Sequence, residues 1–284
     1  MVSTAFIFTD FQFAADGLFS RVGYLFCIAL CGIYARGYGF LRLSAFFQAW
    51  AMIAGLALPV FLACVLLAST GLPLVDRHLI AVDQLMGFDW LSLHHTLQHQ
   101  PEVFFVGERI YLSLQWQPTL LILALAMLMQ HTHLWRFITA WFLALLITIA
   151  IFPFTPAVGG FIHHGITSQT FPHLSEQSIS GWYGIFEQVR EGEITKLGAN
   201  TVTGIVTFPS FHAAGAVLLA YGWMKVKWLR WPMAALNIGV FATSTFIGGH
   251  YLVDLIAGAT IAITSIIAAS RLKYLRADDI AKQA

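Results

Sequence analysis

Two histidines adjoin apolar segments of this sequence, where an ionisable side chain is costly. The first belongs to FPSFHAAG, residues 208–215, and the second to IGGHYLVDLIAG, residues 247–258. Ionisable groups in membrane helices are rare and functional by default. On a helix, His250 and Asp254 would share one face, so the carboxylate could fix the tautomer of the imidazole. This spacing predicts an imidazole that acts as a nucleophile or base.

Ser210 precedes His212 by two positions and lies where a helix N-cap is expected. The free backbone N–H groups of a first helical turn favour an anion, and a capping hydroxyl adds to this. Phosphate is the natural anion here, because one imidazole can attack phosphorus while the other protonates the departing oxygen. The pair of motifs predicts phosphoryl chemistry. The alternative is that each histidine simply bonds a neighbouring carbonyl.

The composition indicates which elements must position these residues. Hydrophobic residues make up 58% of the 284 and charged residues only 10%, against about 25% charged in ordinary soluble domains. We therefore expect an all-α polytopic membrane helix bundle. Apolar runs occur near 20–35, 44–70, 112–130, 135–153, 210–226, 232–248 and 252–270. The first run is short and rich in glycine, so the pattern allows six or seven transmembrane helices.

A single membrane domain, 1–284, accounts for the sequence, which has no internal repeat. Segment 1–19 carries two aspartates and no early basic residue, so it is expected to lie at the interface and is not typical of a signal peptide. The polar stretches 71–111 and 154–208 are expected on the outer face. Region 208–258 carries the catalytic motifs, and 271–284 is expected to be a cytoplasmic tail.

Basic residues are divided unequally between the two sets of connections. One side holds Arg36, Arg42, Arg136, Lys225, Lys227, Arg230, Arg271, Lys273, Arg276 and Lys282, and the other holds Arg21, Arg77, Arg109, Arg190 and Lys196. The positive-inside rule places the richer side in the cytoplasm. The sequence therefore predicts an integral membrane protein with its site on the periplasmic or outer face. The net charge of +1 gives no reason to expect a nucleic-acid partner.

The topology predicts that the two histidines meet. His212 begins one apolar run and His250 begins the last, while a short hairpin near 226–232 returns the chain to the same membrane face. Two imidazoles and the carboxylate of Asp254 are then expected at one depth.

FPSFHA and GGHYLVD together resemble the type 2 phosphatidic acid phosphatase superfamily, which includes vanadium haloperoxidases. The second motif of that superfamily is Pro-Ser-Gly-His. Here Phe211 replaces the glycine, as a bulky residue does in the inositol phosphorylceramide synthase branch. His250 and Asp254 match the end of the third motif, in which Ser-Arg precedes the histidine. The specific match covers about 208–258, and LVDRHLIAVDQLMGFDW resembles bacterial members of that inositolphosphotransferase branch.

This resemblance implies a role for each residue. His250 would be the nucleophile that forms a phosphohistidine, and Asp254 would orient it. His212 would protonate the leaving group and then deprotonate the acceptor, and Ser210 would hold a phosphate oxygen. The family needs no metal or other cofactor for this chemistry.

The sequence also departs from the family. Ser244 occupies the place of the phosphate-binding arginine, and the first motif, Lys, six residues, Arg-Pro, is absent. Because a phosphoryl group in transfer needs positive charge around its oxygens, we expect Arg190 and Lys196 to bind substrate. The alternative is that both are solvated charges paired with nearby glutamates; Arg77 and Arg109 are further candidates. Fewer cations suit a singly charged phosphodiester better than a phosphomonoester.

The sequence therefore predicts a membrane lipid phosphotransferase that moves a phosphoryl or phospho-headgroup from a phospholipid to an alcohol. The alternative within the same superfamily is a lipid phosphate phosphatase, with water as the acceptor. Two other classes stay open, a transporter that relays protons and a hydrolase that holds a metal with both histidines and Asp254. His95 and His99 could also bind zinc from one helix face, but no third ligand is fixed by the spacing. The oligomeric state is not predicted.

Overall fold

The computed structural model describes residues 12–13, 18–174, 179–193, 196–197 and 205–272. The regular elements of the described chain are helices, apart from one short parallel pairing of β1 (Gln12–Phe13) with β2 (Lys196–Leu197). This confirms the expected all-α class. The expected interfacial segment 1–19 and cytoplasmic tail 271–284 lie largely outside the described residues.

Each apolar run predicted from the sequence coincides with a helix. These helices are α1 (Leu18–Gly37), α2 (Leu41–Ala68), α6 (Gln117–Met127), α7 (His131–Ile151), α11 (Phe211–Trp223), α12 (Arg230–Phe246) and α13 (Leu252–Arg271). Shorter elements connect them: α3 (Asp76–Leu85), α4 (Trp90–Leu97), α5 (Pro101–Leu112), η1 (Ser113–Gln115), η2 (Phe152–Phe154), α8 (Gly159–His163) and α10 (Tyr183–Glu191).

Fewer helices than expected can cross a bilayer by length and composition. Within the described chain, three are long and apolar enough: α2, α13, and α7 with its continuation to His163. A fourth span is added if α5 with η1 and α6, which meet at a bend of 50°, cross together. Helix α11 is apolar but has only 13 residues, against about 20 needed to cross the hydrocarbon core. Six or seven spans are therefore not confirmed.

The core of the bundle lies around α7 and α11. Helix α7 packs against α2, α11 and α13, and α11 also packs against α12. Leu121, Leu134, Phe137, Leu218 and Trp223 are fully buried where these helices meet. Because α7 and α11 are enclosed on several sides, polar groups on them can be held in a fixed arrangement.

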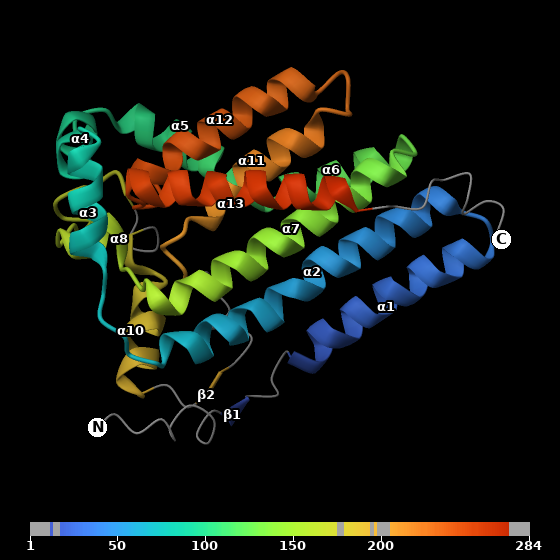
Figure 1. The fold of residues 1–284 in the computed structure, drawn as a ribbon, viewed down its shortest axis with the longest axis horizontal. Coiled ribbons are helices and arrows are strands. Elements are labelled where there is room, and N and C mark those ends of the chain that lie inside the picture. Colours follow the sequence, from blue (N-terminus) through green and yellow to red (C-terminus); the bar gives the residue numbers. More distant parts are fainter. Residues whose placement is uncertain (1–11, 14–17, 175–178, 194–195, 198–204, 273–284) are drawn as a thin grey trace.

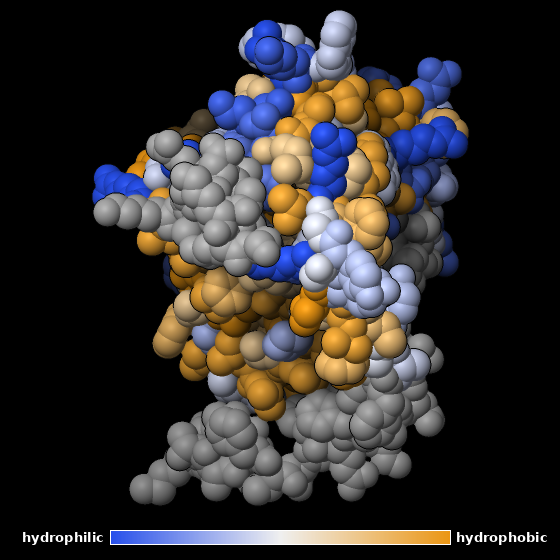
Figure 2. All heavy atoms as spheres, turned by 90° about the vertical axis from the view of Figure 1, so that its right-hand side faces the viewer, coloured by the Kyte–Doolittle hydropathy of each residue, from blue (hydrophilic) through white to orange (hydrophobic). Residues whose placement is uncertain are grey.

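The bundle has two different ends. The connections α1–α2, α6–α7 and α11–α12 lie together at the right of Figure 1, whereas α3, α4, α8 and α10 form a layer at the left. Figure 2 looks onto the right-hand end, where hydrophilic side chains gather over part of the surface. Arg36, Lys225, Lys227, Arg230 and Arg271 belong to the connections or helix termini of this end. The helices α3, α4, α8 and α10 of this layer come from the described parts of 71–111 and 154–208.

Candidate active site

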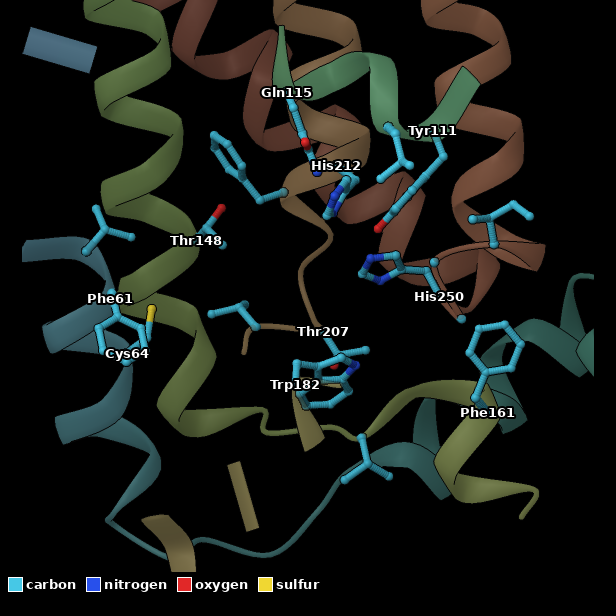
Figure 3. A pocket seen from close by; sticks show the side chains of 18 of the residues that line it. Phe61, Cys64, Tyr111, Gln115, Thr148, Phe161, Trp182, Thr207, His212 and His250 are labelled. Carbon is cyan, nitrogen blue, oxygen red and sulfur yellow. The ribbon is translucent and has the colours of Figure 1, made fainter. Parts of the chain in front are cut away.

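A cavity of about 670 Å³ lies between the bundle and the layer of short helices. Its walls come from α2, α5, α7, the start of α11 and the connection between α12 and α13. Figure 3 shows His212, His250 and Tyr111 side by side on one wall, with Thr148, Phe61 and Cys64 across the cavity. Both histidines predicted from the sequence therefore line the same opening.

His212 owes its place to a capped helix start. Ser210 is the N-cap of α11, and its hydroxyl accepts a hydrogen bond of 3.2 Å from the backbone N–H of Ala213. This confirms the predicted cap and begins α11 so that His212 lies in its first turn. The His212 ring stacks on Tyr111 of α5, with ring centroids 4.4 Å apart and planes inclined by 17°. The imidazole is thus held flat against an aromatic face.

Ser210 itself is fully buried and is not among the residues that line the cavity. Phe211, which follows it, does line the cavity and packs edge-on against Trp141 with ring centroids 5.3 Å apart. The bulky residue in place of the family's glycine therefore forms part of the cavity wall.

His250 lies just before a helix, because α12 ends at Phe246 and α13 begins at Leu252. The expectation that His250 and Asp254 share a helical face is wrong in this detail. The backbone N–H of His250 donates to the carbonyl of Ser244 at 3.1 Å, which folds the chain back on α12. Gly249 has φ of +69°, and a Cβ there would lie 2.7 Å from the Phe161 ring. Glycine is needed at this position both for the backbone conformation and for the close packing.

Asp254 nevertheless lies beside His250. Its Oδ2 atom is 3.4 Å from Nδ1 of His250 and accepts a hydrogen bond of 2.9 Å from the backbone N–H of Tyr251. The first distance is longer than a well-formed N–H···O bond. Catalytic hydrogen bonds are often this loose before substrate binds. Asp254 therefore caps α13 while its carboxylate faces the imidazole.

The two motifs are joined directly through the backbone. The N–H of Ser210 donates to the carbonyl of Asp254 at 3.2 Å. A Cβ on Gly258 would overlap the carbonyl of Ser210, so only glycine lets α13 approach the start of α11 this closely. As a result, the ring centroids of His212 and His250 are 5.9 Å apart, with planes inclined by 50°.

The surroundings of His250 favour a neutral ring. Burial lowers the pKa of His250 to about 4, while a hydrogen bond with the backbone of Thr207 partly opposes the shift. A buried charged imidazole loses its hydration, so the neutral form is preferred. Near pH 7 the ring therefore keeps a free lone pair, which a nucleophile requires.

Two further polar groups, both aspartates, were not predicted from the sequence. Asp76 and Asp83 are both buried on α3. Asp83 accepts hydrogen bonds from the backbone N–H groups of Leu252 and Val253, at 2.8 and 2.9 Å, so it caps α13 from a distant part of the sequence. Asp76 accepts hydrogen bonds from the hydroxyl of Tyr251 and from the backbone of the α8 entry. The spacing of seven residues, which places both aspartates on one helix face, was the available signal.

Asp83→Ala is expected to destabilise the protein, because it leaves two backbone N–H groups at the start of α13 without their acceptor. Each such loss costs about 1–3 kcal/mol, so the free energy of unfolding should fall by about 3 kcal/mol. Thermal denaturation in detergent measures this. Asp89→Ala is the matched control, since Asp89 caps α4 through a single exposed bond to Ser92 and should cost only about 1 kcal/mol. Equal melting temperatures for the two variants would contradict the capping role of Asp83.

Arg190, one of the two predicted cations, is not among the described residues that line the cavity. Arg190 donates from its guanidinium to the carbonyl of Leu72 at 2.7 Å and lies over the ring of Phe186. The side chain of Lys196 lies outside the described part of the structure. Among the residues that the structure describes, no lysine or arginine lines the cavity, whereas Glu108 does.

Ser244, which stands in place of the family's arginine, donates its hydroxyl to the carbonyl of Val240 in its own helix. The pair His95 and His99 is exposed. Within the described ranges, no three His, Cys, Asp or Glu side chains are grouped so that they could hold a metal ion.

Comparison with known proteins gives a family. No curated protein and no solved structure matches the chain. The family model described as the PAP2 superfamily matches residues 77–268, well over half of the 284 residues. The matched range includes both histidine motifs, most of α3 and α13 as far as Ala268. The finer resemblance to inositol phosphorylceramide synthases and to bacterial members is not confirmed by this match. The two histidine motifs of this chain line one cavity, and the family model matches well over half of its residues. The chain therefore belongs to the PAP2 superfamily.

Proposed function

We propose that this protein is a metal-independent lipid phosphotransferase that moves a phosphoryl or phospho-headgroup from a phospholipid to an alcohol through a phosphohistidine. Membership of the PAP2 superfamily already indicates phosphatase or phosphotransferase activity on lipid phosphates. The apolar helices indicate an integral membrane protein. The proposal adds the acceptor, the covalent intermediate and the role of each residue.

One observation carries the proposal: the imidazoles of both motifs face one cavity with their ring centroids 5.9 Å apart. That separation is short enough for a single phosphate group in the cavity to contact both rings. Asp254 faces only one of them, His250, at 3.4 Å. The asymmetry supports His250 as the nucleophile and His212 as the proton carrier.

In the proposed first step, a nitrogen of His250 attacks phosphorus and the bond from phosphorus to the leaving oxygen breaks. His212 gives its proton to that oxygen, so the leaving group departs as an alcohol. The negative charge of the bound phosphate favours the protonated form of His212 before the step. The carboxylate of Asp254 balances the positive charge that develops on the imidazole of His250.

In the proposed second step, the acceptor alcohol occupies the place of the leaving group. His212, now neutral, takes the hydroxyl proton while the alcohol oxygen attacks phosphorus. The bond between phosphorus and the nitrogen of His250 breaks, and both histidines return to their starting protonation states. The phosphatase alternative differs only in that water takes the place of the alcohol.

The far wall of the cavity supports a lipid substrate. It is formed by apolar side chains from α2 and α7, among them Val60, Phe61, Leu145 and Ile149. Ala57 belongs to this wall and is exposed. In the proposal, an acyl chain enters the cavity from the side past Ala57 while the phosphate lies near the histidines.

Ala57→Trp is expected to obstruct this side entrance. The value of kcat/KM for a long-chain phospholipid should fall roughly tenfold, about 1.4 kcal/mol, because an indole would occupy the path of the acyl chain. A short-chain, water-dispersed donor should be turned over as by the wild type. Met52→Trp is the matched control, since Met52 is exposed on the same helix and does not line the cavity. Equal effects of Ala57→Trp on both donors would contradict a lateral lipid path.

That Arg190 and Lys196 supply the positive charge around the substrate phosphate stays a prediction. To reach a phosphate in the cavity, Arg190 would have to leave the carbonyl of Leu72. The positive end of the α11 dipole lies beside His212 and supplies part of the required field. A weak cationic field supports a singly charged phosphodiester as the donor.

The proposal also includes the type of membrane and the direction in which the helix bundle is inserted. We expect the layer of α3, α4, α8 and α10 to face the periplasm or outer side of a bacterial inner membrane, because basic residues gather at the connections of the other end. Cysteine-labelling of an exposed layer residue such as His99→Cys with an impermeant reagent tests this. Labelling in intact cells is the expected result.

The most informative assay gives purified protein in lipid vesicles a panel of labelled phospholipids, with and without alcohol acceptors. A product that contains both the alcohol and the phosphate supports the transferase. Free phosphate or free phospho-headgroup as the sole product would make the protein a phosphatase or phosphodiesterase instead. Turnover that is lost with chelators would favour a metal-dependent hydrolase, and substrate movement without any phosphoenzyme would favour a transporter.

A further inference from the structure

Glu108 is a charged residue in the cavity that the proposed chemistry does not use. It belongs to α5, and Tyr111 and Leu112, which lie three and four positions later, also line the cavity. Residues at these spacings share one face of a helix. Since Tyr111 stacks on His212 with ring centroids 4.4 Å apart, Glu108 lies about one helical turn from the aromatic support of the proposed acid.

The charge of Glu108 is not balanced by a neighbour in the described structure. No ion pair joins Glu108 to any residue that the structure describes, and the adjacent Arg109 lies over the ring of Phe105, 3.5 Å from its centroid. The described lining contains no lysine or arginine, and His250 is neutral near pH 7 because burial lowers its pKa to about 4. The cavity is therefore electronegative beside Glu108, whereas the N-terminus of α11 supplies a partial positive charge beside His212.

A carboxylate in the cavity that no lysine or arginine of the described lining balances is unfavourable for most phosphate donors. A phosphodiester with an uncharged headgroup brings one negative charge close to the carboxylate, and a phosphomonoester brings up to two. Poor hydration of the apolar walls strengthens this repulsion. A donor that carries its own ammonium group instead places a positive charge beside Glu108 while its phosphate contacts the histidines. One helical turn spans about 5.4 Å, and the short linker of an amino-alcohol headgroup spans a comparable length.

We propose that Glu108 determines specificity by binding the ammonium group of a zwitterionic phospholipid headgroup, so that the donor is an amine-bearing phosphodiester. This inference rests on the proposed function and names its donor class. His250 then attacks phosphorus, the bond to the glycerol oxygen breaks, and His212 protonates that oxygen to release diacylglycerol. The phospho-amino-alcohol stays on His250 with its ammonium at Glu108. The acceptor alcohol gives its proton to His212 and displaces His250, so that the acceptor carries the whole phospho-amino-alcohol group.

Donor competition in vesicles tests this inference with the full-length protein. Phosphatidylethanolamine, phosphatidylglycerol, phosphatidylinositol and phosphatidic acid with identical acyl chains are compared by kcat/KM. The wild type is expected to prefer phosphatidylethanolamine over phosphatidylglycerol by about 10–100-fold, the range given by one charged hydrogen bond. Glu108→Gln is expected to remove most of this preference by weakening phosphatidylethanolamine turnover, and Glu108→Lys is expected to reverse it. Glu102→Gln is the matched control, because Glu102 is exposed in the first turn of α5 and does not line the cavity.

The outcomes separate this inference from the proposed function. If the wild type uses phosphatidylglycerol or phosphatidylinositol as readily as phosphatidylethanolamine, and this turnover needs His250, the proposed function stands and the role of Glu108 is wrong. If Glu108→Gln lowers all donors equally, the carboxylate has only a structural role. If no donor is turned over, or turnover survives His250→Ala, the proposed function itself fails. The ratio of kcat/KM for phosphatidylethanolamine to that for phosphatidylglycerol is measured on the wild type. It therefore tests the inference even if the Glu108 variants fold poorly.

Discussion

His250→Ala is expected to abolish phospholipid turnover and to leave no detectable phosphoenzyme. If His250 forms the covalent bond to phosphorus, the remaining groups cannot carry the reaction by the same route. Removing the nucleophile of another covalent enzyme lowers kcat by about a million-fold. Turnover of a labelled phospholipid and retention of label on alkali-quenched protein are the two measurements, since phosphohistidine survives alkali and not acid.

Two controls make this result specific to the site. His99→Ala removes an exposed histidine of the layer that does not line the cavity, and it should keep wild-type turnover. His250→Asn keeps a polar side chain in the buried pocket, so its melting temperature shows whether the loss of turnover comes from unfolding. A folded His250 variant with wild-type turnover would contradict the proposed nucleophile.

His212→Ala is expected to separate the two chemical steps. General acid–base groups typically contribute 10²–10⁴-fold, so turnover of a natural phospholipid should fall by about a thousand-fold. A phosphodiester with a nitrophenol leaving group needs no proton on departure. With that donor the variant should still form the phosphoenzyme and then stop, because no base activates the acceptor.

The measurement is the release of nitrophenol during the first turnover. A burst equal to the amount of enzyme, followed by a slow phase, is the expected result for His212→Ala. Tyr111→Phe is the control variant, because it keeps the aromatic ring that stacks on His212. With the same activated donor, its first-turnover release of nitrophenol and its steady-state rate should both be close to those of the wild type. Equal losses with the natural and the activated donor would contradict a proton-transfer role for His212.

The sequence predicted the parts of the fold that depend on local pattern. Apolar runs marked the helices, and Ser210 was recognised as the N-cap of α11 because capping depends on residues close in sequence. The meeting of His212 and His250 in one cavity was also predicted, since a hairpin between two helices fixes which ends lie together. These inferences need no knowledge of the wider packing.

Features that depend on distant packing were not predictable in the same way. Asp83 caps α13 although about 170 positions separate it from Leu252 and Val253. A contact between residues so far apart cannot be predicted from local sequence patterns. Glu108 was passed over because an exposed helix residue and a cavity residue look alike in sequence. Six or seven spans were not confirmed, partly because α11, although apolar, is only 13 residues long. His250 proved to lie before its helix because Gly249 and the Ser244 carbonyl turn the chain there.

Mapping the modified residue in His212→Ala tests most directly whether the two imidazoles share one phosphorus atom. The variant is loaded with an activated phosphodiester, quenched in alkali, and cleaved into peptides for mass spectrometry. The predicted result is a phosphorylated or phospho-headgroup adduct on His250, in the peptide that contains IGGHYLVD, at close to one per chain. An adduct on another residue, or no adduct despite release of the leaving group, would contradict the proposed mechanism.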